Sequence, residues 1–316
     1  MISNEFAIRT IDLSKSFGQF KAVDKINLNV KKGEIFGFLG PNGAGKTTTL
    51  RMLAGLSKPD FGEISLLDKN VVFGSMHGRE RIGFLPDVPE CYGYMKPLEF
   101  LCFCGELFGL DSSKRKKKAN ELLELVGLEN VKKRIGGFSR GMKQRIGIAQ
   151  ALINNPEIVF MDEPASALDP MGRFDVMEIM TKLKGNTTVF FSTHIITDIE
   201  RVCDTIAIID NGTILEQGTI PELKTKYDNF TISLSFSADS KENDIQQFIE
   251  TIRQRSWCSD AGFDQLSARN LFIKVTDRPI AQNEIPRMIA DYKLPLETMN
   301  SISMSLEDVF LKVVSK

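Results

Sequence analysis

Residues Ile35–Thr47 read IFGFLGPNGAGKT, and this stretch decides the fold of the chain. Its first five residues form a continuous apolar run, which predicts a strand covered on both faces, as in a parallel sheet. The following residues match the pattern G-x-x-x-x-G-K-[ST], and a helix is predicted from Lys46 to about Leu53. A strand, a glycine loop and a helix in this order predict a loop that wraps around nucleotide phosphates.

The chemistry of this loop follows from its residue types. Glycines let the backbone curl until its N–H groups point at oxygen anions, and the helix N-terminus adds the positive end of its dipole. We expect Lys46 to reach the β- and γ-phosphates and the Thr47 hydroxyl to ligate Mg²⁺. A glycine-rich turn that only connects strand to helix is disfavoured, because the motif is complete and correctly placed. The predicted nucleotide contacts here are Gly40, Pro41, Asn42, Gly43, Ala44, Gly45, Lys46, Thr47 and Thr48.

A second apolar run, Ile158–Met161, ends in two acids, Asp162 and Glu163. At the carboxyl edge of a parallel sheet this order places both carboxylates beside the bound phosphates. We expect Asp162 to hold Mg²⁺ or its water and Glu163 to polarise the attacking water as a general base. The signal is weak alone, because acids commonly begin a solvated loop, but it is strong beside the phosphate loop.

Composition describes an ordinary globular protein of 316 residues, with 42% apolar and 26% charged residues. The net charge of −1 argues against an electrostatic nucleic-acid binder. No stretch approaches the run of about 20 uncharged apolar residues that spans a bilayer, and the N-terminus lacks signal-peptide features. The expected location is therefore the cytosol. The five cysteines match neither a disulfide framework nor a zinc site.

Hydrophobic periodicity along the first two thirds of the chain alternates between helix and strand, the α/β pattern of a parallel sheet. Predicted helices are Pro97–Phe108, Arg115–Val126, Gly141–Ile153 and Arg173–Leu183. Predicted strands are Phe6–Leu13, Ile26–Val30, Val189–Ser192, Thr205–Ile209 and Thr213–Gln217. Asn211-Gly212 between the last two strands is a strong hairpin signal.

The tail has a different character and predicts a small α+β domain. Its strand-like runs are Phe230–Phe236 and Leu271–Val275, and its helix-like runs are Asp244–Arg253 and Asn283–Asp291. A last helix is predicted with Ser305 as its N-cap and acids in its first turn. The predicted domains are 1–225 and 226–316, with a helical subdomain at about 89–155.

Further motifs make the chain resemble the nucleotide-binding subunit of an ABC transporter. Phe138–Arg145 reads FSRGMKQR and resembles the family's signature motif, usually LSGGQ. Ser166–Asp169 resembles the D-loop, and Ser192–His194 ends a strand and resembles the switch-histidine motif. Phe17 occupies the place of the aromatic that stacks on adenine. Five separated motifs appear in the family's order, and the resemblance covers residues 5 to about 225.

The resemblance implies a P-loop NTPase cassette of α/β class with an antiparallel β subdomain and a helical subdomain. Family members pack head to tail, so Ser139 and the Gly141 backbone of one copy would grip the γ-phosphate bound to the other. His194 would donate a hydrogen bond to that phosphate, and Asp169 would link the two sites. The expected catalytic residues are then Glu163, His194 and Lys46, and the expected cofactors are ATP and Mg²⁺.

Four positions depart from the family pattern. Ala167 stands in the D-loop where glycine is usual. Arg140 and Met142 stand in the signature where glycine and glutamine are usual. Asp87, in the stretch Ile82–Asp87, takes the place of a glutamine that ligates Mg²⁺ and links to the membrane partner. A carboxylate at Asp87 could still ligate the metal, which makes Thr47, Asp162 and Asp87 the expected metal ligands. The acid at this position, the signature and the ending Ser305–Phe310 together resemble a branch that exports drugs, lipids and polysaccharides.

The favoured hypothesis is an ATP-hydrolysing subunit of a membrane exporter. It implies a second copy of the chain and integral membrane permease subunits as partners, no nucleic acid, and a place on the cytoplasmic side of the membrane. An intracellular helix of each permease would dock in a cleft near Asp87. The alternative is a soluble ABC ATPase that acts on ribosomes or DNA, but such members resemble tandem cassettes or carry long coiled coils. A cassette that only binds nucleotide is disfavoured by Glu163 and His194.

Lys114–Lys118, KRKKK, is the strongest basic run. A solvated helix start is the favoured interpretation. The alternative is contact with anionic lipid headgroups, which attract each basic residue near the surface by about 1 kcal/mol.

Overall fold

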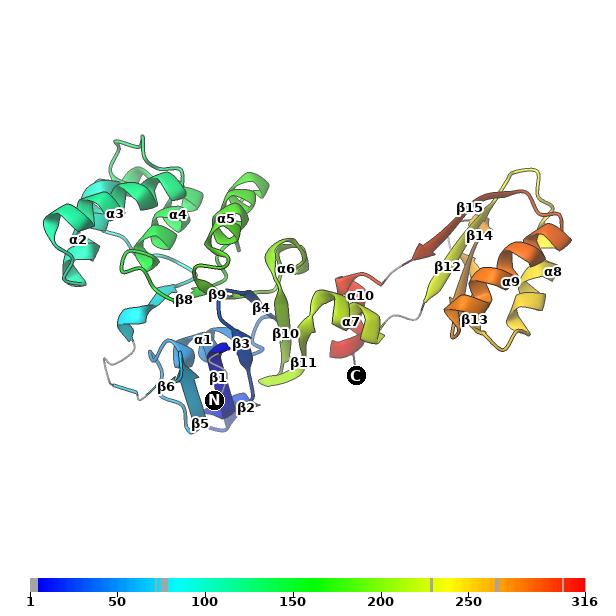
Figure 1. Ribbon diagram of the computed structural model, residues 1–316, viewed down its shortest axis with the longest axis horizontal. Coiled ribbons are helices and arrows are strands. Elements are labelled where there is room, and N and C mark those ends of the chain that lie inside the picture. The colour runs from blue at the N-terminus through cyan, green and yellow to red at the C-terminus, as the bar shows by residue number, and fades with distance from the viewer. Residues whose placement is uncertain are drawn as a thin grey trace. The chain divides into compact units, whose positions relative to one another are not determined.

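The computed structural model describes residues 5–71, 73–74, 79–227, 230–264, 267–302 and 304–315. The chain divides into two compact units, Met1–Ile220 with Val313–Lys316, and Pro221–Lys312 (Figure 1). The division lies close to the boundary proposed from the sequence after residue 225, which falls inside helix α7 (Ile220–Tyr227). Within the described ranges, no helix is both long and apolar enough to cross a membrane.

A six-stranded sheet with the order β11-β10-β4-β9-β8-β7 forms the centre of the first unit. Its strands are β4 (Ile35–Leu39), β7 (Ile82–Leu85), β8 (Ile158–Asp162), β9 (Thr188–Thr193), β10 (Thr205–Asp210) and β11 (Thr213–Thr219). All neighbours are parallel except β10 and β11, which form the predicted hairpin. Every residue of β4, β8 and β9 is buried, which explains the apolar runs Ile35–Leu39, Ile158–Met161 and 189–191 within them.

Because parallel strands end at the same edge of a sheet, three chemically active segments meet there. β4 leads into the phosphate loop, β8 ends at Asp162, and β9 ends one residue before His194. Helix α1 (Lys46–Leu53) begins directly after Gly45, whose φ of 101° lies in the left-handed region. A Cβ there would stand 2.4 Å from the carbonyl oxygen of Ala22, so only glycine fits this turn.

A second, antiparallel sheet confirms the predicted β subdomain. It has the order β2-β1-β5-β6, with β3 paired to β1. Its strands are β1 (Phe6–Phe17), β2 (Phe20–Ile26), β3 (Asn29–Lys31), β5 (Phe61–Leu66) and β6 (Lys69–Asn70). The expected strand Ile26–Val30 was wrong in its bounds, since Ile26 ends β2 and two residues outside any strand separate it from β3. Lys25 takes a positive φ of 50° before this break.

The helical part contains α2 (Pro97–Leu107), α3 (Ser112–Leu125) and α4 (Arg140–Ala151), as the apolar periodicity predicted. α3 begins three residues earlier than expected, because the Asp111 side chain accepts a hydrogen bond from the backbone of Lys114 and caps the helix. The basic run therefore forms the first turns of a capped helix. Lys114 also pairs with Asp111, and Arg115 pairs with Glu106 at 3.1 Å.

Two further helices connect strands of the main sheet. α5 (Pro170–Leu183) runs between β8 and β9, and α6 (Ile196–Val202) runs between β9 and β10. Asp169 caps α5 by accepting a hydrogen bond from the backbone N–H of Gly172, and Pro170 occupies the first helical position.

The second unit has the element order βαββαβ around a four-stranded antiparallel sheet, β13-β14-β12-β15. These six elements are β12 (Thr231–Phe236), α8 (Glu242–Arg253), β13 (Cys258–Asp264), β14 (Ser267–Val275), α9 (Arg278–Asp291) and β15 (Leu296–Ile302). They are followed by α10 (Leu306–Val314), whose residues up to Lys312 belong to this unit. Ile232, Leu234 and Phe236 alternate toward a core shared with Phe248 and Ile285 of the two helices. Ser305 accepts a hydrogen bond from Asp308 N at 3.1 Å, which confirms the predicted cap of α10.

Candidate nucleotide site

The loop between β4 and α1 borders a cavity of about 540 Å³. The cavity is lined by Phe17, Phe20, Ala22, Asn42, Gly43, Gly45, Lys46, Thr47, Thr48, Asp87, Glu163, Ser166 and His194. The structure thus brings the phosphate loop together with Phe17, Asp87, Glu163 and His194, which the sequence singled out in separate motifs. Gly40 and Ala44 of the same loop are buried under it, and a Cβ on Gly40 would lie 2.3 Å from the Ile209 carbonyl oxygen.

Lys46 lies inside the curl of the loop. Its ammonium group donates hydrogen bonds to the carbonyl oxygens of Gly40 and Pro41 at 2.8 and 3.1 Å. It also forms an ion pair with Glu163 Oε1 at 3.2 Å, and only 6% of its side chain is exposed. A buried ammonium with these partners is positioned to exchange them for phosphate oxygens.

Asp162 is the anchor of a small hydroxyl network. Its Oδ1 accepts hydrogen bonds from Ser192 Oγ at 2.7 Å and from Thr47 Oγ1 at 3.1 Å. Ser192 Oγ in turn accepts from the backbone N–H of Glu163 at 3.0 Å. Ser192 therefore holds the Asp162 carboxylate and the Glu163 backbone, a role that sequence reasoning missed because the serine forms part of the strand β9.

The donors around Thr47 suit a hard divalent cation. A hydroxyl and a carboxylate oxygen converge there, and Mg²⁺ prefers such oxygen ligands, completed by water and phosphate. Across the described part of the chain, no group of three acidic, histidine or cysteine side chains could hold a metal by itself. The protein atoms therefore fit Mg²⁺ that arrives with a nucleotide rather than a metal held in a complete protein cage.

The Glu163 carboxylate is held by two side chains. Its two carboxylate oxygens face Lys46 and His194, with His194 Nδ1 3.0 Å from Oε2. Its φ of 47° lies in the left-handed region, where a residue with a Cβ is strained. Strain of this kind is typical of functional sites, and here it turns the chain just after β8.

Two exposed aromatic rings stand at the mouth of the cavity. Phe17 and Phe20 are 56% and 63% exposed and lie opposite each other across the hairpin of β1 and β2. Exposed apolar rings beside a polar cavity are suited to stack on a nucleobase. The sequence predicted Phe17 for this position but not Phe20, because Phe20 begins a strand without clear alternation.

Ser139, Gly141 and Asp169 lie elsewhere. They border a separate cavity of about 430 Å³, together with Arg140, Met142, Arg145, Ala167, Leu168, Met171, Gly172 and Asp175. Ser139 caps α4 by accepting a hydrogen bond from the Met142 backbone at 3.3 Å. Each chain thus carries a phosphate-loop cavity and a second cavity, at the N-termini of α4 and α5.

A family model described as ABC transporter matches residues 23–166. A bacitracin transport ATP-binding protein of Bacillus licheniformis is 36% identical to this chain over 97% of each sequence. This chain belongs to the ATP-binding subunits of ABC transporters. An uncharacterized ABC transporter ATP-binding protein of Bacillus subtilis is 47% identical over 71% of this chain and 74% of its own length.

A solved structure supports the fold and the chemistry of this ABC subunit. The dimeric post-hydrolysis structure of an ATP-binding cassette bound to ADP and phosphate has a TM-score of 0.60 and 26% identity, covering 67% of this chain and 98% of its own. The predicted family, the cassette fold and the classification as an ATPase are confirmed. The roles assigned to individual site residues stay predictions.

Proposed function

We propose that this ABC subunit powers a membrane exporter as a head-to-tail pair on the cytoplasmic side of the membrane, bound to integral membrane subunits. One observation carries the pairing. The cavity with the phosphate loop and the cavity with Ser139 and Gly141 are separate in one chain. In a dimer with twofold symmetry, the phosphate-loop cavity of each chain would face the Ser139 cavity of its partner. This arrangement would give two complete nucleotide sites.

The helix α4 suits the second half of such a site. Its N-terminus presents the Ser139 hydroxyl and the backbone N–H of Gly141, and helix N-termini favour anions. Arg140 adds a positive charge at the first helical position, where the family usually has glycine. These groups would hold the γ-phosphate of the nucleotide bound to the partner subunit.

The remaining site residues divide the hydrolysis between them. Thr47 and Asp162 would hold Mg²⁺, which would supply positive charge to neutralise the β- and γ-phosphates. Lys46 would exchange its bonds to the loop carbonyls and Glu163 for phosphate oxygens. The Glu163 carboxylate, released on one side, would then accept a proton from the attacking water. His194 orients this carboxylate from the other side through its Nδ1.

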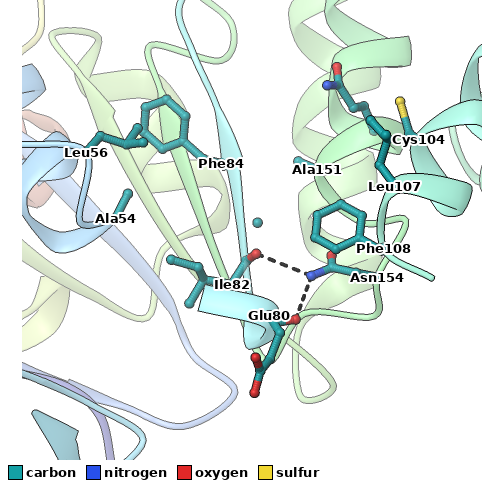
Figure 2. A pocket seen from close by; sticks show the side chains of 12 residues that line it. Ala54, Leu56, Glu80, Ile82, Phe84, Cys104, Leu107, Phe108, Ala151 and Asn154 are labelled. Carbon is teal, nitrogen blue, oxygen red and sulfur yellow. Dashed lines mark hydrogen bonds between the residues drawn. The ribbon is translucent and has the colours of Figure 1, made fainter. Parts of the chain in front are cut away.

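We propose that a permease helix docks at an apolar cavity of about 380 Å³ that Phe84 borders, and not at Asp87 itself, which borders the phosphate-loop cavity. Leu56 and Phe84 of the central part stand on one side, and Cys104, Leu107 and Phe108 at the end of α2 stand on the other (Figure 2). The Asn154 amide closes the floor by donating a hydrogen bond to Glu80 O at 2.7 Å (Figure 2). Leu56, Leu107 and Phe108 are 55%, 72% and 52% exposed, and exposed apolar side chains gathered at one cavity are typical of a docking surface.

The exporter assignment has two supports. The relative that matches nearly the whole chain, second unit included, is named as a bacitracin transport protein. The exporter-like features at Asp87, in the signature and at Ser305–Phe310 support the same branch. Neither support favours the alternative of a soluble ATPase acting on ribosomes or DNA.

Glu163→Gln tests the paired mechanism. The amide keeps the size of the side chain but cannot take a proton from water, so ATP binding persists while hydrolysis falls by at least about a hundredfold. The variant is expected to form an ATP-dependent dimer in size-exclusion chromatography, and Glu178→Gln on α5 serves as the matched control. Full turnover in Glu163→Gln, or a monomer at saturating ATP, would contradict the proposal.

A pull-down tests the partner. Gentle detergent extraction of cells that express the tagged chain is expected to recover a multi-span membrane protein, and Leu107→Asp should weaken this recovery without loss of ATP binding. Recovery of ribosomes instead would favour the soluble alternative.

A further inference from the structure

Asp87 makes a hydrogen bond that joins the segments that follow strands β7 and β8. It lies two residues after β7, and its Oδ1 accepts a hydrogen bond from Ser166 Oγ at 3.1 Å. Ser166 follows β8, four residues beyond Asp162. Both residues border the phosphate-loop cavity. The side chain of Asp87 is thus engaged by the protein itself.

Ser166 lies within a tightly turned segment that continues to Asp169 and contains a strained residue. The Ser166 N–H donates to Glu163 O at 3.1 Å, and the Leu168 N–H donates to Ala165 O at 3.4 Å. Between them Ala167 has a φ of 67°, a left-handed conformation that is unfavourable for any residue with a Cβ. A turn that stores strain in this way persists only when its surroundings hold it, and the bond to Asp87 is one such restraint.

The other end of this turn belongs to the second cavity. Leu168 and Asp169 border it beside Ser139 and Gly141, and a Cβ on Gly141 would lie 3.9 Å from Leu168 Cδ2. Asp169 also caps α5 through Gly172. The turn Ser166–Asp169 therefore runs from the phosphate-loop cavity to the surface where the partner's nucleotide would bind.

We propose that Asp87 is a positioning residue that holds the turn Ser166–Asp169 through Ser166, rather than a ligand of the metal. The restraint on the turn is a property of the single chain. Only its consequence for hydrolysis rests on the proposed head-to-tail pair, because the turn presents Leu168 and Asp169 to the second cavity. The shorter aspartate side chain suits this role, since it meets the serine hydroxyl directly.

Three substitutions separate the charge of Asp87 from its hydrogen bond. Asp87→Asn removes the charge but keeps an oxygen that accepts from Ser166. Asp87→Ala and Ser166→Ala each remove the bond from one side. Glu90→Gln, an exposed acid in the same segment, is the matched control for a lost charge.

Hydrogen–deuterium exchange on the full chain without nucleotide gives the first readout. The amides of Ser166–Asp169 should exchange about tenfold faster in Asp87→Ala and in Ser166→Ala, the equivalent of one hydrogen bond to a carboxylate. Glu90→Gln should stay within about twofold of the parent protein, and Asp87→Asn should exchange more slowly than Asp87→Ala, because its neutral oxygen still makes a hydrogen bond of about half the strength. The double variant Asp87→Ala with Ser166→Ala should exchange no faster than either single variant, because both remove the same bond. Unchanged exchange in Asp87→Ala, or multiplied effects in the double variant, would overturn the proposal.

The Mg²⁺ concentration for half-maximal ATP hydrolysis gives the second readout. It should be the same within about twofold in the parent protein, Asp87→Asn and Ser166→Ala. A requirement raised about tenfold in Asp87→Asn but unchanged in Ser166→Ala would assign Asp87 to the metal and overturn the proposal. Failure of Glu163→Gln to dimerise would count against the paired mechanism alone, because the exchange measurement needs neither nucleotide nor partner.

Discussion

At the scale of single residues, the polar side chains of the site form hydrogen bonds and ion pairs with one another. Lys46 faces Glu163, Glu163 faces His194, and Asp162 faces Thr47. Each of these groups is satisfied by a neighbour that a nucleotide or a metal could replace. When a nucleotide binds, these side chains therefore exchange hydrogen bonds and ion pairs with one another for bonds to the nucleotide or the metal. This exchange limits the desolvation cost of the bound phosphates.

Ser192→Ala tests whether the buried hydroxyl between the two acids sets their positions. The substitution removes its bonds to Asp162 Oδ1 and to the Glu163 backbone, and leaves a buried N–H unpaired. We expect the rate of hydrolysis to fall by about tenfold to a hundredfold, with ATP affinity reduced much less, because the loop contacts remain. Steady-state ATPase assays and titration with a fluorescent ATP analogue measure the two quantities.

Ser57→Ala, a serine outside the cavity, is the control for the general effect of losing a hydroxyl. An unchanged rate in Ser192→Ala would show that the acids are positioned without it.

At the scale of elements, the N-terminal residues of two helices serve both helix stability and the predicted function. The caps of α4 and α5 are Ser139 and Asp169, which the family resemblance also assigns to nucleotide binding. An N-cap side chain accepts a hydrogen bond from a backbone N–H of the first turn of its helix. It therefore lies beside the other free N–H groups of the helix N-terminus. The same positions therefore suit anion binding, and replacing them is expected to affect both properties.

In the cavity beside α2, we expect the reactivity of the Cys104 thiol to depend on pH. Burial, and secondarily the neighbouring Cys91, raises the pKa of the Cys104 thiol to about 11. The thiolate is the reactive form, so alkylation of Cys104 by iodoacetamide should rise about tenfold per pH unit between pH 8 and 10. A thiol with the ordinary pKa of about 8.5 would level off near pH 9.

Peptide mass spectrometry follows the modification, and Cys104→Ala identifies the signal. A plateau near pH 9 would contradict the buried thiol. A permease helix in the cavity should slow the reaction at every pH.

At the scale of the whole molecule, each unit has its own hydrophobic core. The first is built around the main sheet, with Phe36 stacked on Phe190 at 5.1 Å between ring centroids. The second lies between the sheet of the tail and its helices, where Phe248 contacts Phe236 and Tyr292 edge-on. Two cores allow the two units to differ in stability.

Phe248→Ala should destabilise the second unit by about 3–5 kcal/mol, because it removes a fully buried ring from that core. MgATP should raise the melting temperature of the first unit only, since its site lies wholly there. Differential scanning calorimetry with and without MgATP measures both effects. Equal shifts of all transitions in Phe248→Ala would contradict separate cores, and Leu311→Ala, an exposed position, is the control.

Local sequence was sufficient wherever a contiguous segment carries its own geometry. The phosphate loop, the apolar strands β4, β8 and β9 and the cap of α10 were all predictable, because each depends on neighbours in the chain. β2, β13 and β15 were not predicted. Their sequences mix polar and apolar residues without alternation, and they form because a partner strand supplies hydrogen bonds.

The sequence alone identified the family and the ATPase chemistry, and it predicted the residues that carry this chemistry, because those motifs are short and contiguous. Only the tertiary structure decided which of them meet. It separated Ser139 and Asp169 from the phosphate loop, placed Ser192 between two acids, and joined Asp87 to Ser166 across 79 positions of chain. Such contacts depend on strand order and on the close packing of α4 and α5, and no local pattern of residue types encodes a distance between segments so far apart.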